Sequence, residues 1–294
     1  MVKLAAILML LATSASAQLL ENGQDRREID LQVIDGRALV AVAIDGQSGL
    51  MMIDNGTPQA VMLNRDAVTL SAGQEVGRGV AASGQSVVVD LHEAPVMTVA
   101  GRPFALPERV TSGNFAFVEE GFGAGFMGFI GSPVLSEAPF LLDLSRKRMV
   151  VMRSVSLDLI QADVRGRIFF SIWNDSLPTS VVEVGRTAML VDFDTGDSGT
   201  LYLRDATRAA LVAGGNLCCG PGIMELSGLR IGGVDFSPTP VRVVQAGGPE
   251  DFRRTGASDN LRLGASFLMQ NPVLWDFASR ELVFLTSTAT VLAP

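Results

Sequence analysis

The feature of this 294-residue sequence that most constrains its fold is an internal repeat. A block that begins at Gly131 aligns without a gap with a block that begins at Gly264. Both blocks carry Leu at the fifth and eleventh positions, Pro at the ninth, Asp at the thirteenth and Val at the twentieth. A second matched pair of blocks surrounds Asp54, upstream of Gly131, and Asp194, upstream of Gly264. The blocks follow one another in the same order and at nearly the same spacing in both halves, which predicts two duplicated lobes.

The segments within the repeats are typical of β-strands. Stretches such as ALVAVAIDG, SVVVDL, SVVEVG and TAMLVDFD are rich in Val and Ile and are bounded by Gly, Pro, Asp or Asn. Helical periodicity is scarce, and the best candidate helix begins near Leu203. We therefore predict a mostly β chain with an N-terminal lobe at residues 31–154, a linker at residues 155–179 and a C-terminal lobe at residues 180–294.

The first residues are typical of a secretory signal peptide, which we predict over residues 1–17. Lys3 gives a positive start, residues 4–11 form an apolar run, and a small-residue A-x-A site ends at Ala17. The apolar run is too short to span a bilayer, so membrane insertion is not expected. We expect cleavage near Ala17, a polar N-terminal segment at residues 18–30, and a periplasmic or secreted protein.

Composition excludes several classes of function. The formal net charge of −8 disfavours binding to nucleic acid. The one histidine and the two adjacent cysteines, Cys218 and Cys219, give no zinc ligand set and no disulfide framework. We expect these cysteines to be small apolar residues in a turn. No phosphate-binding glycine loop stands between a strand and a helix, so no nucleotide or other cofactor is expected.

An apolar strand followed by Asp-x-Gly, and later by an apolar block that ends in Gly, occurs in each lobe. The blocks are Asp54-Asn55-Gly56 with Phe129-Ile130-Gly131, and Asp194-Thr195-Gly196 with Arg262-Leu263-Gly264. This arrangement resembles the pepsin and retropepsin-like aspartic peptidases over residues 31–287, and among them the compact bacterial two-lobe type. The resemblance implies duplicated acid-protease β-barrel lobes with a cleft between them.

The resemblance also implies the chemistry. Two carboxylates at hydrogen-bond distance cannot both be charged, so they share one proton and act as the base and the acid of peptide hydrolysis. Asp54 and Asp194 are the candidate catalytic pair, and the implied substrate is a peptide or an unfolded protein. Asn55, Gly56, Thr57, Thr195 and Gly196 are the candidate supporting residues. We expect the protein to be a monomer.

Glycine-rich segments follow each aspartate and are candidates for hairpin flaps over the substrate. The first segment spans residues 76–86 and contains Gly77, Gly79 and Gly84; the second spans residues 213–222. The family's flap tyrosine is missing, because the only tyrosine of the chain is Tyr202 in the second half. This places the chain nearer the retropepsin style.

Three features depart from the family pattern. Asn55 stands where Thr or Ser is expected, so a symmetric hydroxyl tie between the two turns cannot form, although an amide can donate a hydrogen bond. Asp192 lies two residues before Asp194 and faces the same side of a strand, and Asp197 follows the turn directly. These carboxylates leave open a second hypothesis: a peptidase-like protein that binds peptides or a partner without hydrolysis.

A third hypothesis uses the overlapping motif Gly-Asp-Ser-Gly at residues 196–199. Ser198 would be the nucleophile of a serine hydrolase, with His92 as its base and Asp143 as the third member. This hypothesis is disfavoured because the residues around His92 and Ser198 do not match the trypsin pattern. It also leaves the matching position of Asp54 unexplained. His92 is better interpreted as a surface residue at the end of a strand, and Asp143 and Asp276 as carboxylates at strand ends or turns.

Overall fold

The computed structural model describes most of the chain. The described residues are 18–21, 23–81, 84–123, 125–156, 160–173, 177–197, 200–202, 205–219, 223–244 and 260–289. The predicted signal peptide at residues 1–17 and the candidate nucleophile Ser198 lie outside the described residues. Within the described ranges, no helix is long and apolar enough to cross a membrane.

The secondary structure is mostly β, as predicted. The first half contains β1 (Arg26–Ile34), β2 (Arg37–Ile44), β3 (Gln47–Ile53), β4 (Val61–Asn64), β5 (Gln74–Val80), β6 (Ser86–Glu93), β7 (Met97–Val99), β8 (Arg102–Phe104), β9 (Arg109–Gly113), α1 (Ala116–Phe122), β10 (Phe126–Ile130), α2 (Ser132–Leu135), β11 (Phe140–Asp143) and β12 (Arg148–Met152). The second half contains η2 (Gln161–Asp163), β13 (Val164–Phe169), β14 (Ser171–Trp173), β15 (Leu177–Val184), β16 (Thr187–Phe193), β17 (Thr200–Tyr202), α4 (Asp205–Ala213), β18 (Leu217–Cys218), β19 (Met224–Leu226), β20 (Leu229–Ile231), β21 (Val234–Asp235), β22 (Thr239–Val244), β23 (Asn260–Leu263), α5 (Ala265–Leu268), β24 (Val273–Asp276) and β25 (Glu281–Leu285). The helix predicted near Leu203 is confirmed as α4.

Two segments carry more structure than their predicted roles imply. The polar segment at residues 18–30 includes the start of β1, where Arg27 and Ile29 alternate as buried residues with exposed neighbours. The segment at residues 155–179, expected to be a linker, contains β13, β14 and the start of β15. β13 pairs with β25, so this connection adds an edge strand to the sheet.

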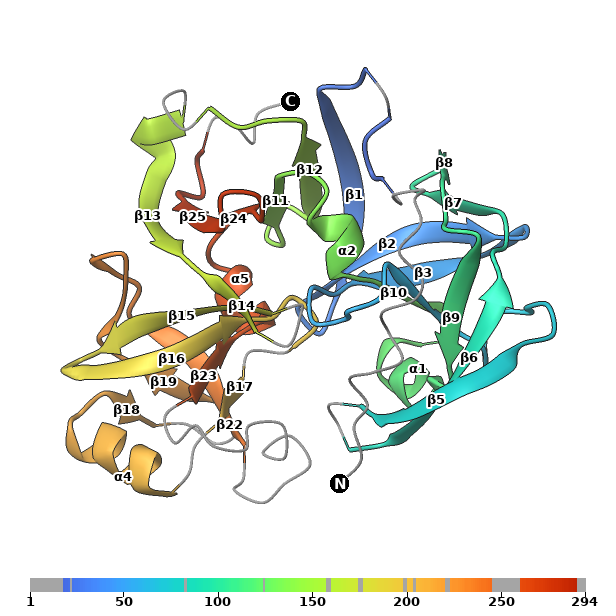
Figure 1. Ribbon diagram of the computed structural model, residues 1–294. Coiled ribbons are helices and arrows are strands. Elements are labelled where there is room, and N and C mark those ends of the chain that lie inside the picture. Colours follow the sequence, from blue (N-terminus) through green and yellow to red (C-terminus); the bar gives the residue numbers. More distant parts are fainter. Residues whose placement is uncertain are drawn as a thin grey trace.

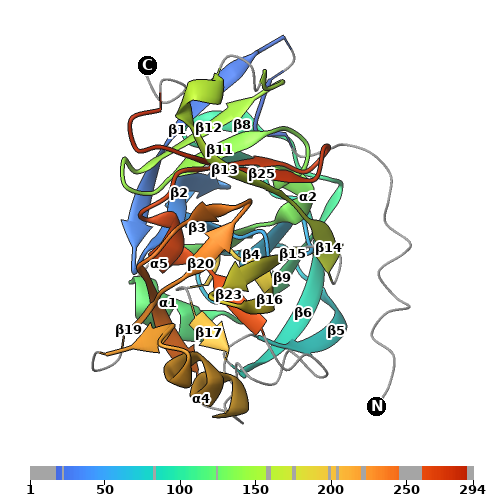
Figure 2. The same ribbon diagram turned by 90° about the vertical axis from the view of Figure 1, so that its left-hand side faces the viewer.

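The two halves of the chain lie side by side and are joined by one shared sheet (Figure 1). Its order begins β13-β25-β24-β11-β12-β1 and continues through β2, β3, β10, β4, β9, β6 and β5. In Figure 2 the strands β1, β11, β12, β13 and β25 lie at one end of the molecule and α4 lies at the other. At the junction β11 pairs antiparallel with β24, and Leu141 faces Leu274. These two leucines are equivalent positions of the sequence repeat, so the halves meet about a local twofold axis.

Strand pairing repeats in the two halves. β3 pairs in parallel with β10, and β16 pairs in parallel with β23. β4 with β9, and β17 with β22, are likewise parallel. Each block that begins with the repeated glycine continues into a short helix, α2 or α5, and then into a hairpin, β11–β12 or β24–β25. The duplication predicted from sequence is therefore present in the topology.

Tight turns between the strands and buried apolar side chains along them explain locally why these segments form strands. The β1–β2 and β2–β3 connections are the dipeptides Asp35-Gly36 and Asp45-Gly46, in which all four residues have positive φ. Asp-Gly in that conformation matches the twist of a two-residue hairpin. Between them, Leu39, Val40 and Val42 of β2 are buried. These hairpins carry β3 to its end at Ile53, directly before the first candidate aspartate.

Candidate active site

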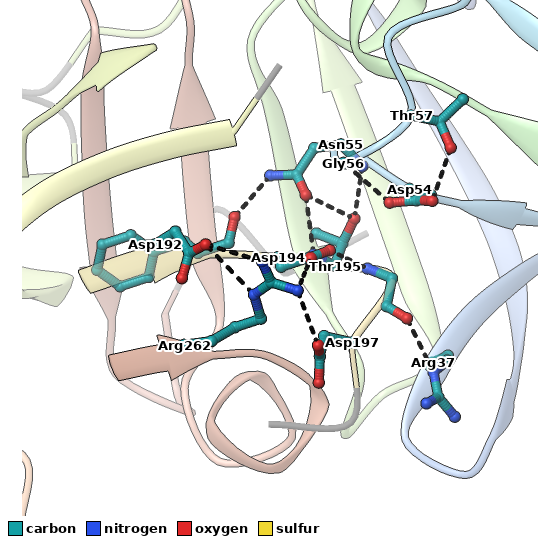
Figure 3. A network of polar contacts seen from close by, with 12 residues as sticks. Arg37, Asp54, Asn55, Gly56, Thr57, Asp192, Asp194, Thr195, Asp197 and Arg262 are labelled. Atoms are coloured by element: carbon teal, nitrogen blue, oxygen red, sulfur yellow. Dashed lines mark hydrogen bonds and ion pairs between the residues drawn. The ribbon is translucent and has the colours of Figure 1, made fainter. Parts of the chain in front are cut away.

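Two equivalent turns meet at the contact between the halves (Figure 3). Asp54 follows β3, and its backbone amide donates to the Ile130 carbonyl at 3.0 Å. Asp194 follows β16, and its amide donates to the Leu263 carbonyl at 3.2 Å. Each turn is closed three residues later by an amide that donates to the carbonyl of its own aspartate. The parallel partner strands, β10 and β23, thus position the two aspartates in the same way.

A reciprocal set of hydrogen bonds joins the turns through Asn55 and Thr195. The Asn55 amide N–H donates to Thr195 Oγ1 at 3.0 Å, and the Thr195 amide N–H donates to Asn55 Oδ1 at 2.9 Å. Asn55 Nδ2 donates to the Phe193 carbonyl and Thr195 Oγ1 donates to the Ile53 carbonyl, both at 2.9 Å. Both side chains are buried, at 0% and 1% exposure. A carboxamide therefore takes the place of the expected hydroxyl, and the tie is nearly symmetric in its backbone acceptors.

The two candidate carboxylates border the same glycines. A Cβ placed on Gly56 would lie 3.0 Å from Asp54 Oδ1 and 3.3 Å from Asp194 Oδ1. A Cβ on Gly196 would lie 2.5 Å from Asp54 Oδ1, which is too close for any side chain. The absence of a side chain at both positions thus lets the carboxylates approach the opposite turn. The structure brings together all the candidate catalytic and supporting residues.

The hydrogen bonds to the two carboxylates differ. Asp54 Oδ1 accepts from the Gly56 amide at 2.8 Å, and Asp194 Oδ1 accepts from the Gly196 amide at 2.9 Å. Asp54 Oδ2 accepts from the Thr57 hydroxyl at 2.7 Å. Asp194 Oδ2 instead lies 3.0 Å from Nη1 of Arg262. Asp54 is half-buried, whereas Asp194 is only 5% exposed.

Arg262 connects the three acidic residues of the second turn. Its guanidinium is buried at 1% exposure, and Nη2 lies 3.0 Å from Asp192 Oδ2. Nη1 lies 3.0 Å from Asp197 Oδ2 as well as from Asp194 Oδ2. The sequence predicted correctly that Asp192 and Asp194 face the same side of their strand. Arg262 thus supplies a buried cation to three carboxylates that are themselves largely buried.

Sequence reasoning missed Arg262, which it treated as a member of the block that ends in Gly264. The repeat held a usable signal. Arg262 aligns with Phe129 and Asp192 aligns with Met52, so a cation and an anion replace two apolar residues of the first half. In the structure Phe129 pairs with Met52 across β10 and β3, and Arg262 pairs with Asp192 across β23 and β16. When an acidic and a basic residue replace two apolar residues that pair in the other half, they indicate an ion pair.

Arg37, at the start of β2, is a second residue that the sequence did not single out. Its Nε donates to the Gly196 carbonyl at 2.9 Å and its Nη1 pairs with Asp35 at 2.6 Å. Its guanidinium carbon also lies 5.6 Å from the centre of the Phe122 ring. The first half therefore supports the turn of Asp194 through a second contact.

The first candidate flap forms the β5–β6 hairpin. Gly77 and Gly79 lie on β5, a Cβ on either would meet nothing within 4 Å, and Gly84 has a φ of 90° near the turn. Val87 of this hairpin belongs to a buried apolar cluster that also contains Met52, Phe115, Phe126 and Phe129. The phenylalanine-rich stretch therefore packs beside the strand that leads to Asp54. In the second candidate segment, Cys218 ends β18 and Cys219 follows it with a positive φ of 44°, and both are exposed free thiols.

The surface assignment of His92 is wrong. The residue is 5% exposed because the chain folds over its ring. Its Nδ1 lies 2.8 Å from the Ser71 carbonyl oxygen and its Nε2 lies 2.8 Å from Ser112 Oγ. The carboxylate of Asp143 bonds Ser145 and Arg146. Among the described residues, the hydrogen bond between histidine and aspartate that the serine hypothesis needs is therefore not formed.

The second repeated aspartate, Asp276, accepts hydrogen bonds from the amides of Ala278 and Ser279, as a turn carboxylate does. Within the part of the chain that the structure describes, no group of three or more His, Cys, Asp or Glu is placed to hold a metal ion. The chemistry available at the meeting of the two turns is that of two carboxylates, fixed in opposite halves and held by donors of different charge.

Comparison with known proteins gives the fold. No protein-family model matches the chain, and no curated protein matches it in sequence. Among solved structures, basic 7S globulin from soybean matches with a TM-score of 0.57 and 12% identity over 90% of this chain and 95% of that one. An aspartic proteinase from Irpex lacteus matches with a TM-score of 0.56 and 11% identity over 91% of this chain and 99% of that one. The chain therefore has a mostly β fold of the kind found in pepsin-like proteins.

Proposed function

We propose that this protein is an exported aspartic endopeptidase of the two-lobe type. Its catalytic pair is Asp54 and Asp194, and its substrate is a peptide or an unfolded protein. The observation that carries the proposal is the approach of both carboxylates to Gly56, in turns that Asn55 and Thr195 tie together. Export rests on the signal-peptide pattern at residues 1–17.

The proposed reaction uses water as the nucleophile. One carboxylate of the pair is ionised and takes a proton from water, while the other is protonated and gives its proton to the carbonyl oxygen of the substrate. No covalent intermediate and no cofactor are required. A pair of this kind works over a limited pH range, because activity is lost when both members are protonated or both are ionised.

The test is cleavage of casein between pH 3 and pH 8 by the mature protein and by three variants, with and without pepstatin. Asp54→Asn and Asp194→Asn should each lower the rate by about 10²–10⁴-fold, and Ser198→Ala should leave it unchanged. Activity that survives in either Asp variant would contradict the proposal. Loss in Ser198→Ala alone would assign the reaction to the serine.

A second candidate function is binding in the cleft without hydrolysis. Two observations favour it: a charged residue, Arg262, contacts one member of the pair, and one structural neighbour carries the name of a globulin rather than of a proteinase. If the folded wild-type protein cleaves no casein at any pH, fluorescence titration with unstructured casein peptides tests it. Saturable binding that Gly196→Ala weakens would support this function, and the absence of binding would reject it.

A further inference from the structure

We propose that Arg262 is a positioning residue that keeps Asp194 ionised and leaves the shared proton on Asp54. This assigns Asp194 as the base and Asp54 as the acid, and it rests on the proposed function. The inference follows from comparing equivalent positions of the two halves, which share their backbone hydrogen bonds but differ in their charges.

The outer oxygens of the two carboxylates have different donors. Asp54 Oδ2 is bonded by the hydroxyl of Thr57, three residues after the aspartate. The equivalent residue of the second half is Asp197, whose carboxylate cannot donate when ionised. Arg262 takes over the role of donor: its Nη1 lies 3.0 Å from both Asp194 Oδ2 and Asp197 Oδ2.

The two donors differ in the protonation states of the carboxyl group with which they can form a hydrogen bond. A threonine hydroxyl can rotate and accept a hydrogen bond, so Thr57 can also bond a protonated Asp54. A guanidinium has only donors and a fixed charge, so Arg262 favours a carboxylate at Asp194. Burial by itself would favour the neutral form of Asp194, which is 5% exposed, but a contact cation opposes that effect.

Other charges surround Asp194. Asp192 and Asp197 lie on its own strand and turn, Asp54 faces it from the first half, and Arg37 donates to the Gly196 carbonyl while paired with Asp35. The carboxylates of Asp192 and Asp197 are each 3.0 Å from a nitrogen of Arg262, so their charge acts on Asp194 across the guanidinium. Among the described residues, the guanidinium of Arg262 lies 3.0 Å from Asp194 Oδ2, and at short range the nearer charge dominates.

The assignment gives a balanced reaction cycle. Asp194 takes a proton from water as the water oxygen bonds the carbonyl carbon, and Asp54 gives its proton to the carbonyl oxygen. The C–N bond then breaks as the leaving nitrogen takes the proton from Asp194. Asp54 recovers a proton from a hydroxyl of the tetrahedral intermediate. At the end Asp194 is ionised and Asp54 is protonated again, so the site returns to its starting state.

The decisive experiment is an NMR titration of protein labelled with ¹³C at the aspartate carboxyl groups. Each single variant, Asp54→Asn or Asp194→Asn, assigns the carboxyl signal that it loses and lets the remaining member of the pair titrate without its partner. Asp194 should titrate at least about one pH unit lower than Asp54. In the charge-balanced variant D54N/D192N/R262Q, which removes the Asp192–Arg262 pair together, the midpoint of Asp194 should rise by about one unit or more. The matched control D54N/R262K, which retains the cation, should keep the low midpoint.

Equal midpoints, or a lower midpoint for Asp54, would overturn the assignment, as would an unchanged Asp194 midpoint in D54N/D192N/R262Q. Circular dichroism and size-exclusion chromatography establish that each variant is folded. The titration does not need an active enzyme, so a wild-type protein without peptidase activity would reject the proposed function while the location of the proton is still decided. In an active enzyme, D192N/R262Q should move the acid limb of the kcat/KM profile to higher pH, and R262K should not.

Discussion

The Asn55 amide donates to Thr195 Oγ1 at 3.0 Å, and the Thr195 amide donates back to Asn55 Oδ1 at 2.9 Å. The two residues belong to different halves of the chain and are 140 positions apart. Their side chains also donate to the carbonyls that precede the two candidate aspartates. Any change in this tie should therefore affect both the stability of the molecule and the positions of the carboxylates.

Replacing Asn55 tests the tie. Asn55→Ala leaves the Phe193 carbonyl and the Thr195 amide buried without these partners, which should lower the free energy of unfolding by about 2–5 kcal/mol. Asn55→Thr restores a hydroxyl and should lose less than Asn55→Ala. Urea denaturation followed by circular dichroism measures both. A loss below about 0.5 kcal/mol for Asn55→Ala, the size typical of a neutral surface substitution, would show that the tie contributes little.

Gly196→Ala tests the closeness of the two turns. The added Cβ would lie 2.5 Å from Asp54 Oδ1 and 2.7 Å from its Cγ, so the carboxylate must move. Displacement of a reacting group by about 1 Å costs on the order of 10²-fold in rate, and we expect a loss of at least that size in casein cleavage. Gly121→Ala, on α1, is the matched control, because nothing lies within 4 Å of its Cβ position. Equal activities of the two variants would contradict the described approach.

The stacked rings of Phe140 and Trp275 test the shared sheet. Their centroids are 5.8 Å apart, both side chains are 0% exposed, and they join β11 to β24 across the contact between the halves. Phe140→Ala should lower the free energy of unfolding by about 3–5 kcal/mol. Val181→Ala, at a position that is 60% exposed, should change it by less than about 0.5 kcal/mol. Similar urea midpoints for the two variants would refute this account of the core.

The thiol of Cys218 should be accessible but slow to react. A hydrogen bond with Cys219 that favours the protonated thiol, followed by desolvation, raises the pKa of Cys218 above its ordinary value. Because the thiolate is the nucleophile, a raised pKa lowers the reactive fraction at neutral pH and moves the gain in reactivity to higher pH. Iodoacetamide alkylation of the native protein, read at each cysteine by mass spectrometry, should be slow at Cys218 at pH 7. It should accelerate when Cys219 is replaced by Ala. Rapid alkylation of wild-type Cys218 at pH 7 would contradict this.

Much of the fold could be predicted because its signals are local or repeated. Short Val-rich and Ile-rich segments between turn residues predict strands, and the Asp-Gly dipeptides predict hairpins. The gapless match after Gly131 and Gly264 predicts two equivalent halves, and the structure shows Leu141 facing Leu274. The alternation of side chains along a strand also places Asp192 and Asp194 on one face. Each of these depends only on neighbours in the chain or on its internal symmetry.

The other features depend on contacts between residues that are far apart in the chain. His92 lies near the end of β6, where the sequence predicts an exposed side chain. In the structure both ring nitrogens of His92 make hydrogen bonds, to the Ser71 carbonyl and to Ser112 Oγ. Asn55 looked like a defect in a motif, but its amide has donors and acceptors that fit both turns. Arg262 is 70 residues from Asp192, and only the parallel pairing of β23 with β16 places its guanidinium among three carboxylates. The strands, the duplication and the matching turns of Asp54 and Asp194 can thus be read from the amino-acid sequence alone. The surroundings of those carboxylates depend on contacts between strands that are distant in the sequence. Because the site is buried, each charge and each hydrogen-bond donor there has a strong effect on the carboxylates.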